Sequence, residues 1–332
     1  MNVVLSRLDR VGDLILSTPA IASVRRSWPD AYVALVCSRH NAVVVERNPD
    51  VDAVHVLPAD ETPARFGRRF RGACDVAIAL APRAPDFALA GATRAPVRVG
   101  YTYVRRYVAR ATARLYLSRL GLSQADPALS DRLASRPVHH EVDQVNDLVR
   151  LAGGTHVSRD LVVPVDDSDR KAVAAVPGDG IAFHLAPRWF REGSTYASTV
   201  ALVGALHALG RPVVVTYGDD ARVEAATLRQ AGVADAVVGG LSFSQWAAVF
   251  EKSALVVTVD TGATHVASAV RRPAVVLFEH RYFNLSSQEW SPYRVPSACI
   301  RKPSSDDAAA LERSRAEILV AVRRVLDVAA VV

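Results

Sequence analysis

The sequence predicts an α/β fold built from two Rossmann-like domains, whose parallel sheets face each other across a cleft. Short β-branched runs alternate with amphipathic segments along the whole chain, a pattern typical of parallel strands joined by crossover helices. The pattern occurs twice, and a junction containing proline and aspartate near Gly153–Asp169 separates the two sets. The 332 residues suit two domains of roughly 150 residues each. We therefore expect an N-terminal domain at 1–160 and a C-terminal domain at 161–332.

The first domain is expected to contain five strands, each a short apolar run bounded by turn residues. They are Val3–Ser6, Tyr32–Cys37, Ala53–Leu57, Val76–Leu80 and Val97–Gly100. Helical periodicity fills most of the gaps between them, notably at Asp13–Arg26 and His140–Leu151.

The second domain repeats this order. Its predicted strands are Gly180–His184, Pro212–Tyr217, Ala236–Val238, Leu255–Val259 and Ala274–Phe278. Its predicted helices include Ser194–Leu209, Asp220–Ala231 and Phe243–Glu251. A terminal amphipathic stretch, Ala308–Val328, is expected to pack back on the first domain.

Composition narrows the classes of partner. Half of the residues are hydrophobic and 22% are charged, which is typical of an ordinary folded protein. The net charge of +6 favours an anionic partner, such as a nucleotide, a phosphorylated glycan or an anionic membrane surface. We expect no nucleic acid partner, because aromatic residues make up only 7% and no basic stripe with interleaved aromatics occurs.

The sequence indicates a cytoplasmic, soluble protein. No apolar run reaches the ~20 residues of a spanning helix, and Arg7, Asp9 and Arg10 interrupt the N-terminal apolar stretch too early for a secretory signal. The three cysteines lie far apart and no His-x-x-x-His pair occurs, so we expect reduced thiols and no metal site. The glycine-rich dinucleotide fingerprint, the phosphate-binding loop of ATPases and the nucleophile elbow of hydrolases are all absent.

The most informative segment follows the predicted strand Leu255–Val259. There an Asp-Thr-Gly turn leads into a helical pattern, which places unpaired backbone N–H groups and a helix dipole at the carboxyl end of a strand. The small side chains of Gly262 and Ala263 would let a pyrophosphate approach the backbone closely. The alternative is that the turn only connects the strand to the helix, with Asp260 capping the helix.

A second distinctive turn follows the first strand. The loop carries Arg7 and Arg10, and Gly12-Asp13 begins a helix at the predicted mouth of the cleft. A carboxylate there could act as general base on an acceptor hydroxyl, whereas the alternative is that Asp13 only caps the helix.

A third segment, Tyr103–Arg119, has helical periodicity. Arg106, Arg110 and Arg114 share one face, and the apolar residues Val104, Val108, Ala111 and Leu115 gather on roughly the opposite face. The arginine face is either an ordinary solvated surface or a platform for an anionic acceptor or membrane headgroups.

The sequences around the two turns together resemble the signature sequences of a known family. The opening Arg-x-Asp-Arg-Val-Gly-Asp-x-x-Leu-x-x-Pro (residues 7–19), followed by Arg25–Ala31, resembles the start of ADP-heptose:lipopolysaccharide heptosyltransferases, glycosyltransferase family 9. Asp260–His265 with Arg272–Phe278 resembles that family's donor-site signature. The stretches His140–Gln144 and Leu148–Gly153 are similar to the helix that leads into its second domain.

The resemblance implies a GT-B fold and an inverting transfer that needs no metal or cofactor, with the acceptor on the first domain and the nucleotide sugar on the second. Asp13 would deprotonate the acceptor hydroxyl, and the acceptor would meet Arg7, Arg10, Arg106 and Arg110. The resemblance assigns the donor to the strand-end loop at Ala186 and Pro187, to Leu241 and Ser242 beside the base, and to the turn itself. That turn comprises Asp260, Thr261, Gly262, Ala263, Thr264 and His265.

Two departures from the family pattern stand out. Many members carry a lysine near a Trp-Pro that stabilises the leaving diphosphate, whereas this chain has Arg188 and Arg191 in that loop and only three lysines overall. Arginine binds phosphate in a bidentate manner and could replace the lysine. The family's usual Gly-Pro-Thr after the strand ending at Phe278 is Glu279-His280-Arg281 here.

We therefore expect a glycosyltransferase that moves heptose from ADP-heptose to a saccharide or glycolipid acceptor, namely the lipopolysaccharide inner core, with weak attachment to the inner membrane. One alternative keeps the fold but uses another nucleotide sugar, or a capsule, protein or metabolite acceptor. A second is a non-catalytic nucleotide- or glycan-binding relative. A third is a two-domain nucleotide-sugar epimerase.

Overall fold

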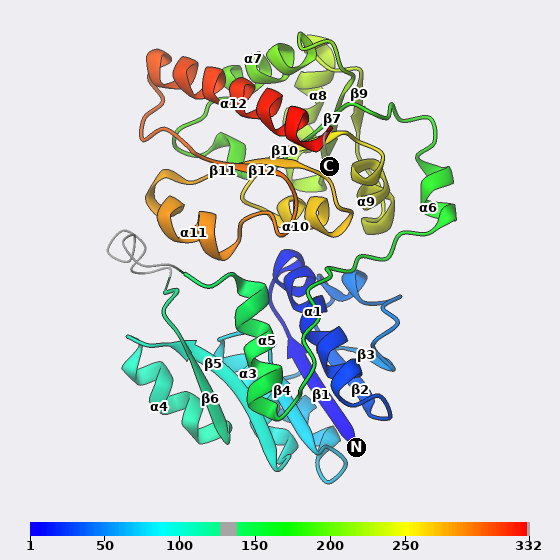
Figure 1. Cartoon of the computed structure of the whole chain (residues 1–332), viewed down its shortest axis with the longest axis vertical. Coiled ribbons are helices and arrows are strands. Elements are labelled where there is room, and N and C mark those ends of the chain that lie inside the picture. The colour runs from blue at the N-terminus through cyan, green and yellow to red at the C-terminus, as the bar shows by residue number, and fades with distance from the viewer. Residues whose placement is uncertain (127–137, 331–332) are drawn as a thin grey trace. The chain divides into compact units, whose positions relative to one another are not determined.

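The computed structural model describes residues 1–126 and 138–330 (Figure 1). The chain divides into two compact units, Met1–Pro164 and Val165–Val332, at a point inside the predicted junction. Each unit contains one six-stranded, fully parallel sheet covered by helices. The predicted α/β fold with two Rossmann-like parallel sheets is confirmed. Within the described residues, no helix is long and apolar enough to cross a membrane.

The sheet of the first unit has the order β3-β2-β1-β4-β5-β6. Its strands are β1 (Asn2–Arg7), β2 (Tyr32–Cys37), β3 (Ala53–Val56), β4 (Val76–Ala79), β5 (Val97–Tyr103) and β6 (Arg119–Ser123). Five of them match the predicted runs to within a few residues. The edge strand β6 was missed because its sequence, Arg-Leu-Gly-Leu-Ser, has only two large apolar residues and contains a glycine.

Helices cover both faces of this sheet. They are α1 (Val11–Ser27), α2 (Pro63–Gly67), α3 (Ala84–Thr93), α4 (Tyr107–Tyr116) and α5 (Glu141–Ala152), with 3-10 turns at Ala42–Val44 and Arg68–Phe70. Helices α1 and α5 pack together on one face, while α3 packs against α2 and α4 on the other. The His140 side chain caps α5 by accepting a hydrogen bond from the amide of Val142.

Helix α1 is buried along most of its length although Pro19 lies in its interior. Proline has no N–H, so the carbonyl of Ile15 loses its helical donor. The hydroxyl of Thr18 donates to that carbonyl at 2.7 Å and so replaces the missing bond. This local repair lets a single uninterrupted helix carry Asp13 at its beginning.

The sheet of the second unit has the order β12-β11-β10-β7-β8-β9. Its strands are β7 (Ile181–Leu185), β8 (Val213–Tyr217), β9 (Ala236–Val238), β10 (Leu255–Val259), β11 (Ala274–Phe278) and β12 (Ser297–Arg301). The first five confirm the predicted strands, and β12 was not predicted.

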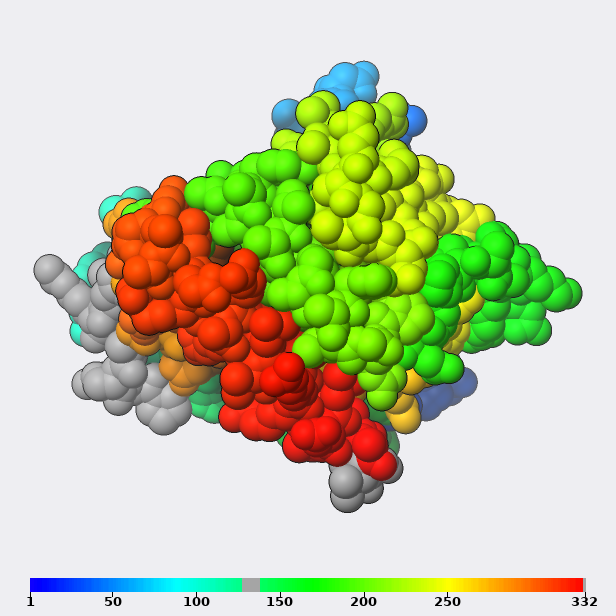
Figure 2. All heavy atoms as spheres, turned by 90° about the horizontal axis from the view of Figure 1, so that it is seen from above, coloured from blue at the N-terminus to red at the C-terminus, as the bar shows by residue number. Residues whose placement is uncertain are grey.

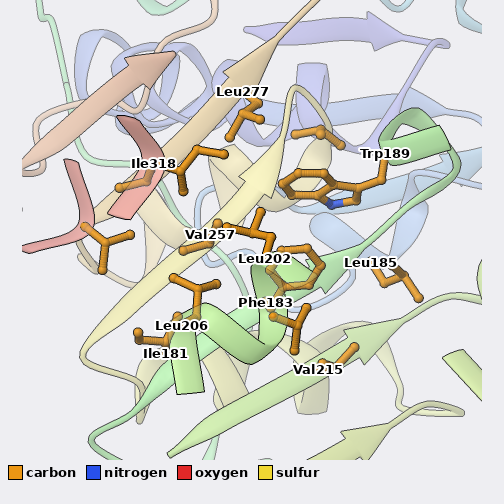
Figure 3. Packing of buried hydrophobic residues seen from close by; sticks show 14 of the residues in the cluster. Ile181, Phe183, Leu185, Trp189, Leu202, Leu206, Val215, Val257, Leu277 and Ile318 are labelled. Atoms are coloured by element: carbon orange, nitrogen blue, oxygen red, sulfur yellow. The ribbon is translucent and has the colours of Figure 1, made fainter. Parts of the chain in front are cut away.

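The helices of the second unit are α6 (Asp167–Ala172), α7 (Tyr196–His207), α8 (Arg222–Ala231), α9 (Phe243–Glu251), α10 (Gly262–Ala269), α11 (Phe283–Glu289) and α12 (Ala308–Ala329), with 3-10 turns η4 (Pro187–Phe190), η5 (Asp219–Ala221) and η6 (His280–Tyr282). Strand residues Ile181, Phe183 and Leu185 point into a core shared with α7 (Figure 3).

The terminal helix corrects one expectation. We expected α12 to pack on the first domain, but its buried residues Ile318, Ala321, Val322 and Val325 belong to the core of the second unit. Figure 2 shows α12, in orange and red, lying beside α7, in green, on the outer surface of this unit. The apolar stripe predicted an amphipathic helix correctly but could not identify the surface that buries it.

Candidate active site

Both sheets have a topological switch point, where the strand order runs in opposite directions from a central pair. In the first unit this pair is β1 and β4, and in the second it is β7 and β10. Ligands of open parallel sheets bind beyond the carboxyl ends of the strands at such points. The two turns singled out in the sequence follow β1 and β10, so each lies at the switch point of its own unit.

Arg7 is the centre of a charged cluster at the switch point of the first unit. Its guanidinium donates to Asp9 at 2.9 Å, to Glu141 at 2.8 Å and to the carbonyl of Leu80 at 2.6 Å. The Tyr101 hydroxyl also donates to Glu141, at 3.0 and 3.1 Å from its two oxygens. Burial by itself would lower the pKa of Arg7, but the surrounding carboxylates raise it well above its ordinary value.

Asp13 lies at the accessible side of this cluster. Its Oδ1 is 3.6 Å from Nη2 of Arg7, and its side chain keeps 20% of its surface exposed. Arg10, not Asp13, is the N-cap of α1, and no side-chain capping bond is made there. Burial raises the pKa of Asp13 to about 7; the charges of Asp9 and Glu141 add to the rise, and Arg7 opposes it. A carboxylate that titrates near neutral pH is well suited to act as a general base.

The same cluster contains a carboxyl group that sequence reasoning did not find. Asp86, in the first turn of α3, is fully buried, and neither of its oxygens has a well-formed hydrogen bond to a described residue. Burial raises the pKa of Asp86 to about 7, with a further contribution from Asp9. Nothing in the local sequence indicates that Asp86 is buried, because an acidic residue in a first helical turn is usually exposed and interacts with the helix dipole.

In the second unit, the turn after β10 has the predicted form. Thr261 is the N-cap of α10, and its hydroxyl lies 3.2 Å from the carbonyl of Val259, so it does not cap the first amides of the helix. The amides of Gly262 and Ala263 belong to the first turn, where helix geometry provides no intrahelical acceptor. His265, one turn further along, is buried. The start of α10 can therefore donate to an anion.

Arg188 lies directly beside this turn. It belongs to η4, which follows β7, and its Nη1 donates to both the carbonyl and the carboxylate of Asp260, at 2.5 and 2.6 Å. Its neighbour Trp189 anchors η4, because the indole is buried against Phe183 and its N–H donates to the carbonyl of His184 at 2.8 Å. The structure thus brings a cation to the amide-rich start of α10. Arg191 is exposed and follows η4.

Lys302 contacts the η4 segment that carries Arg188. The residue follows β12, its side chain is completely buried, and its ammonium donates to the carbonyl of Arg188 at 2.8 Å. Nζ also lies 3.6 Å from Oε1 of Glu279. Burial lowers the pKa of Lys302, while Glu279 opposes the shift. One feature of the sequence points to Lys302: it is a rare lysine that follows an apolar run in a chain dominated by arginine.

Comparisons with known proteins connect these features to a family. Residues 194–317 match the sequence model of glycosyltransferase family 9 (heptosyltransferase). The chain is also 25% identical over 283 residues to lipopolysaccharide heptosyltransferase 3 of Escherichia coli, an alignment that covers 80% of each protein. The chain is thus similar to family 9 heptosyltransferases, and these relatives indicate a glycosyltransferase.

Solved structures share the fold of this glycosyltransferase. A glycosyl transferase family 9 structure from Veillonella parvula superimposes with a TM-score of 0.76 at 17% identity and covers 98% of this chain and 97% of the other. The E. coli heptosyltransferase WaaC with ADP gives a TM-score of 0.68 at 18% identity, covering 96% and 98%. At these identities the likeness concerns the fold.

The structure assigns different surroundings to the arginines that we expected to contact the glycosyltransferase's acceptor. Arg7 is a correction, because it is buried and its donors are used by Asp9, Glu141 and Leu80. Within the cluster, Arg7 binds the carboxylates of Asp9 and Glu141. Arg10 is exposed at the start of α1.

The other two expected acceptor arginines lie at α4. Arg106 forms a bidentate pair with Asp126 at 2.6 and 2.9 Å. Arg110 is half-buried and donates to the carbonyl of Val104 at 3.1 Å. Both arginines are therefore already engaged within the first unit.

The remaining predicted donor residues of the glycosyltransferase differ in accessibility. Ala186 is buried and Pro187 is exposed at the start of η4. Leu241 is half-buried, and Ser242 caps α9 in a reciprocal arrangement with Gln245. Because the Ser242 hydroxyl accepts the Gln245 amide at 3.2 Å, that side chain is used by the helix.

Replacing Lys302 with methionine is expected to destabilise the second unit by about 2–3 kcal/mol, because Glu279 and the Arg188 carbonyl lose a buried cation. Chemical denaturation measures this difference. Lys171→Met, at an exposed position of α6, is the matched control and should change stability by less than about 0.5 kcal/mol. Equal stability of the two variants would contradict a supporting role for Lys302.

Replacing Asp86 with asparagine is expected to stabilise the glycosyltransferase increasingly as the pH rises. A carboxyl whose pKa is higher in the folded than in the unfolded state contributes stability below about pH 4 and loses it as the pH rises through about 7. Asparagine removes this loss, so the variant should gain on the order of 2 kcal/mol over the wild type between pH 5 and pH 8. Denaturation at both pH values tests this, and a pH-independent difference would show that Asp86 does not titrate as described.

Proposed function

We propose that this glycosyltransferase transfers heptose from ADP-heptose to a saccharide of the lipopolysaccharide inner core, at the cytoplasmic face of the inner membrane. The observation that supports the chemistry most directly is the partly exposed carboxylate of Asp13, whose pKa is raised to about 7 at the switch point of the first unit. The family match and the similarity to an E. coli lipopolysaccharide heptosyltransferase support the choice of donor and acceptor.

In the proposed reaction, the ionised carboxylate of Asp13 takes the proton of an acceptor hydroxyl. The acceptor oxygen then forms a bond to the anomeric carbon from the side opposite the phosphate, and the bond between that carbon and the diphosphate oxygen breaks. ADP leaves with the bonding electron pair, and the configuration at the anomeric carbon is inverted.

Charge develops on the diphosphate during this step and must be stabilised by fixed donors. The amides at the start of α10 and the guanidinium of Arg188 are the groups that we assign to this role. We propose that these groups provide the stabilisation and that no metal ion or cofactor takes part. Transfer should then persist at full rate in the presence of EDTA.

A transfer assay with a panel of donors tests the proposal. ADP-heptose, other ADP-sugars and UDP-sugars are each supplied with heptose-free inner-core lipopolysaccharide, and products are identified by mass spectrometry. Heptose addition from ADP-heptose alone is the expected result. Transfer of a different sugar would retain the glycosyltransferase and reject heptose, while donor turnover without any acceptor would favour the epimerase alternative.

A further inference from the structure

Helix α4 of the first unit is oriented opposite to the usual amphipathic helix. Its solvent face carries Tyr107, Val108 and Leu115, which are 73%, 82% and 81% exposed, together with the exposed Ala111. The sequence pattern placed Val108, Ala111 and Leu115 on the face opposite the arginines and did not decide which face is buried. The helix is strongly amphipathic, but it is the apolar side that points away from the protein.

The packing of α4 explains this orientation. Ala113 is buried against the unit, and Tyr116 lies so close to Gly91 of α3 that a Cβ on the glycine would come within 2.7 Å of the tyrosine ring. Small residues and this close approach therefore determine the rotation of the helix. The face of α4 that packs against the unit is thus formed by Ala113 and Tyr116. The large apolar residues of the helix therefore remain on the face exposed to solvent.

The exposed face lies in an exclusively basic region of the chain. Between Asp86 and Asp126 the sequence contains seven arginines and no aspartate or glutamate; the arginines are Arg94, Arg98, Arg105, Arg106, Arg110, Arg114 and Arg119. Arg105 and Arg114 flank the apolar face, are exposed and have no ion-pair partner among the described residues. An apolar face bordered by unpaired cations is complementary to a surface that is both apolar and anionic.

A hollow of about 630 Å³ adjoins the face. It is lined on one side by Val108 and neighbouring residues of α4, and on the other by Pro82, Ala84 and Phe87, close to the carboxyl ends of β4 and β5. This hollow extends the apolar surface of α4 towards the edge of the sheet at which the Arg7 cluster lies. Elsewhere in the described chain, exposed large apolar side chains are more widely spaced: Val223 is the only one on α8, and Val320 and Val328 lie about two turns apart on α12.

We propose that α4 docks the protein on an anionic lipid bilayer, with Tyr107, Val108 and Leu115 entering the interface and Arg105 and Arg114 meeting lipid phosphates. Amphipathic helices of this kind lie in the plane of the membrane surface, and binding combines apolar burial with attraction to anionic headgroups. The docking surface is independent of the donor chemistry, because none of these five side chains belongs to the Asp13 or Arg188 sites.

The test is co-sedimentation of the full chain with vesicles. The protein is expected to pellet with phosphatidylglycerol–phosphatidylcholine vesicles and not with pure phosphatidylcholine vesicles, and 0.5 M salt should weaken the binding. The double variant Val108→Ser/Leu115→Ser should lower the affinity for anionic vesicles at least tenfold. The double variant Arg105→Gln/Arg114→Gln should also lower the affinity for anionic vesicles, and the remaining binding should depend less on salt concentration.

Val223→Ser/Val320→Ser is the matched control, since these valines are 77% and 64% exposed on α8 and α12. It should bind vesicles as the wild type does, and all variants should bind ADP equally in solution. Failure of the wild type to pellet with anionic vesicles would overturn the proposal, as would unchanged binding of the α4 serine variant. The alternative partner for α4 is a second copy of the chain, and sedimentation velocity without vesicles tests it. If the wild type were a dimer and Val108→Ser/Leu115→Ser a monomer, α4 would be a contact between two copies.

Discussion

Replacing Asp13 with asparagine is expected to lower the rate of transfer by about 10²- to 10⁴-fold, the usual contribution of a positioned general base. Asparagine has the same shape and cannot accept the acceptor's proton. Folding should be preserved, because Asp13 does not cap α1 and Arg7 keeps its bonds to Asp9 and Glu141. A coupled assay for ADP release with acceptor present measures the rate, and a thermal melt checks the fold.

The pH profile gives this prediction a second readout. Only ionised Asp13 can accept a proton, so the wild-type rate should rise with pH and approach a plateau above about 7, because the pKa of Asp13 is raised to about 7. Asp9→Asn is the matched control within the cluster. It should retain transfer and move the profile to lower pH, since the charge of Asp9 contributes to the raised pKa of Asp13. Loss of transfer in Asp9→Asn with full activity in Asp13→Asn would assign the base to Asp9.

Replacing Arg188 with alanine should have the second largest effect, a loss of about 10²-fold in kcat together with weaker binding of ADP. The guanidinium lies at the start of α10, where we place the leaving diphosphate, and removing one fixed donor from such a site typically costs 10²- to 10³-fold. Transfer kinetics and calorimetric titration with ADP measure the two effects. Arg188→Lys should recover part of the rate, because it keeps the charge and loses the bidentate geometry.

Two controls separate loss of charge from disruption of the turn. Asp260→Asn keeps Arg188 and can still accept its hydrogen bond, so it should retain much more activity than Arg188→Ala. Arg191→Ala changes an exposed neighbour of the same loop and should have a small effect. If Arg191→Ala were the more damaging variant, the cation that replaces the family lysine would be Arg191.

Much of the site could be predicted because it follows strands. The runs before Asp13 and Asp260 are apolar and β-branched, so their lengths and ends were visible in the sequence. In a parallel sheet, residues that follow such strands lie at one edge. The residues that surround these groups could not be predicted. Glu141 is 134 positions from Arg7, and no local pattern indicates that α5 brings its carboxylate to within 2.8 Å of the guanidinium.

Helix α4 and Lys302 show the same limit in different ways. Periodicity established which residues of α4 share a face, but the close approach of Tyr116 to Gly91 decided which face points outward. Sequence reasoning did not single out Lys302, whose ammonium is brought by the fold to the carbonyl of Arg188, 114 positions away in the chain.

The sequence by itself determined the two parallel sheets, their central strands and the two turns that carry Asp13 and the start of α10, because local propensity and hydrophobic period specify each of these. The tertiary structure decided the partners: which charges are buried together, how far burial raises the pKa of Asp13, and which surface each amphipathic helix presents. Those properties depend on distances between segments remote in the chain, and hydrophobic periodicity carries no information about them.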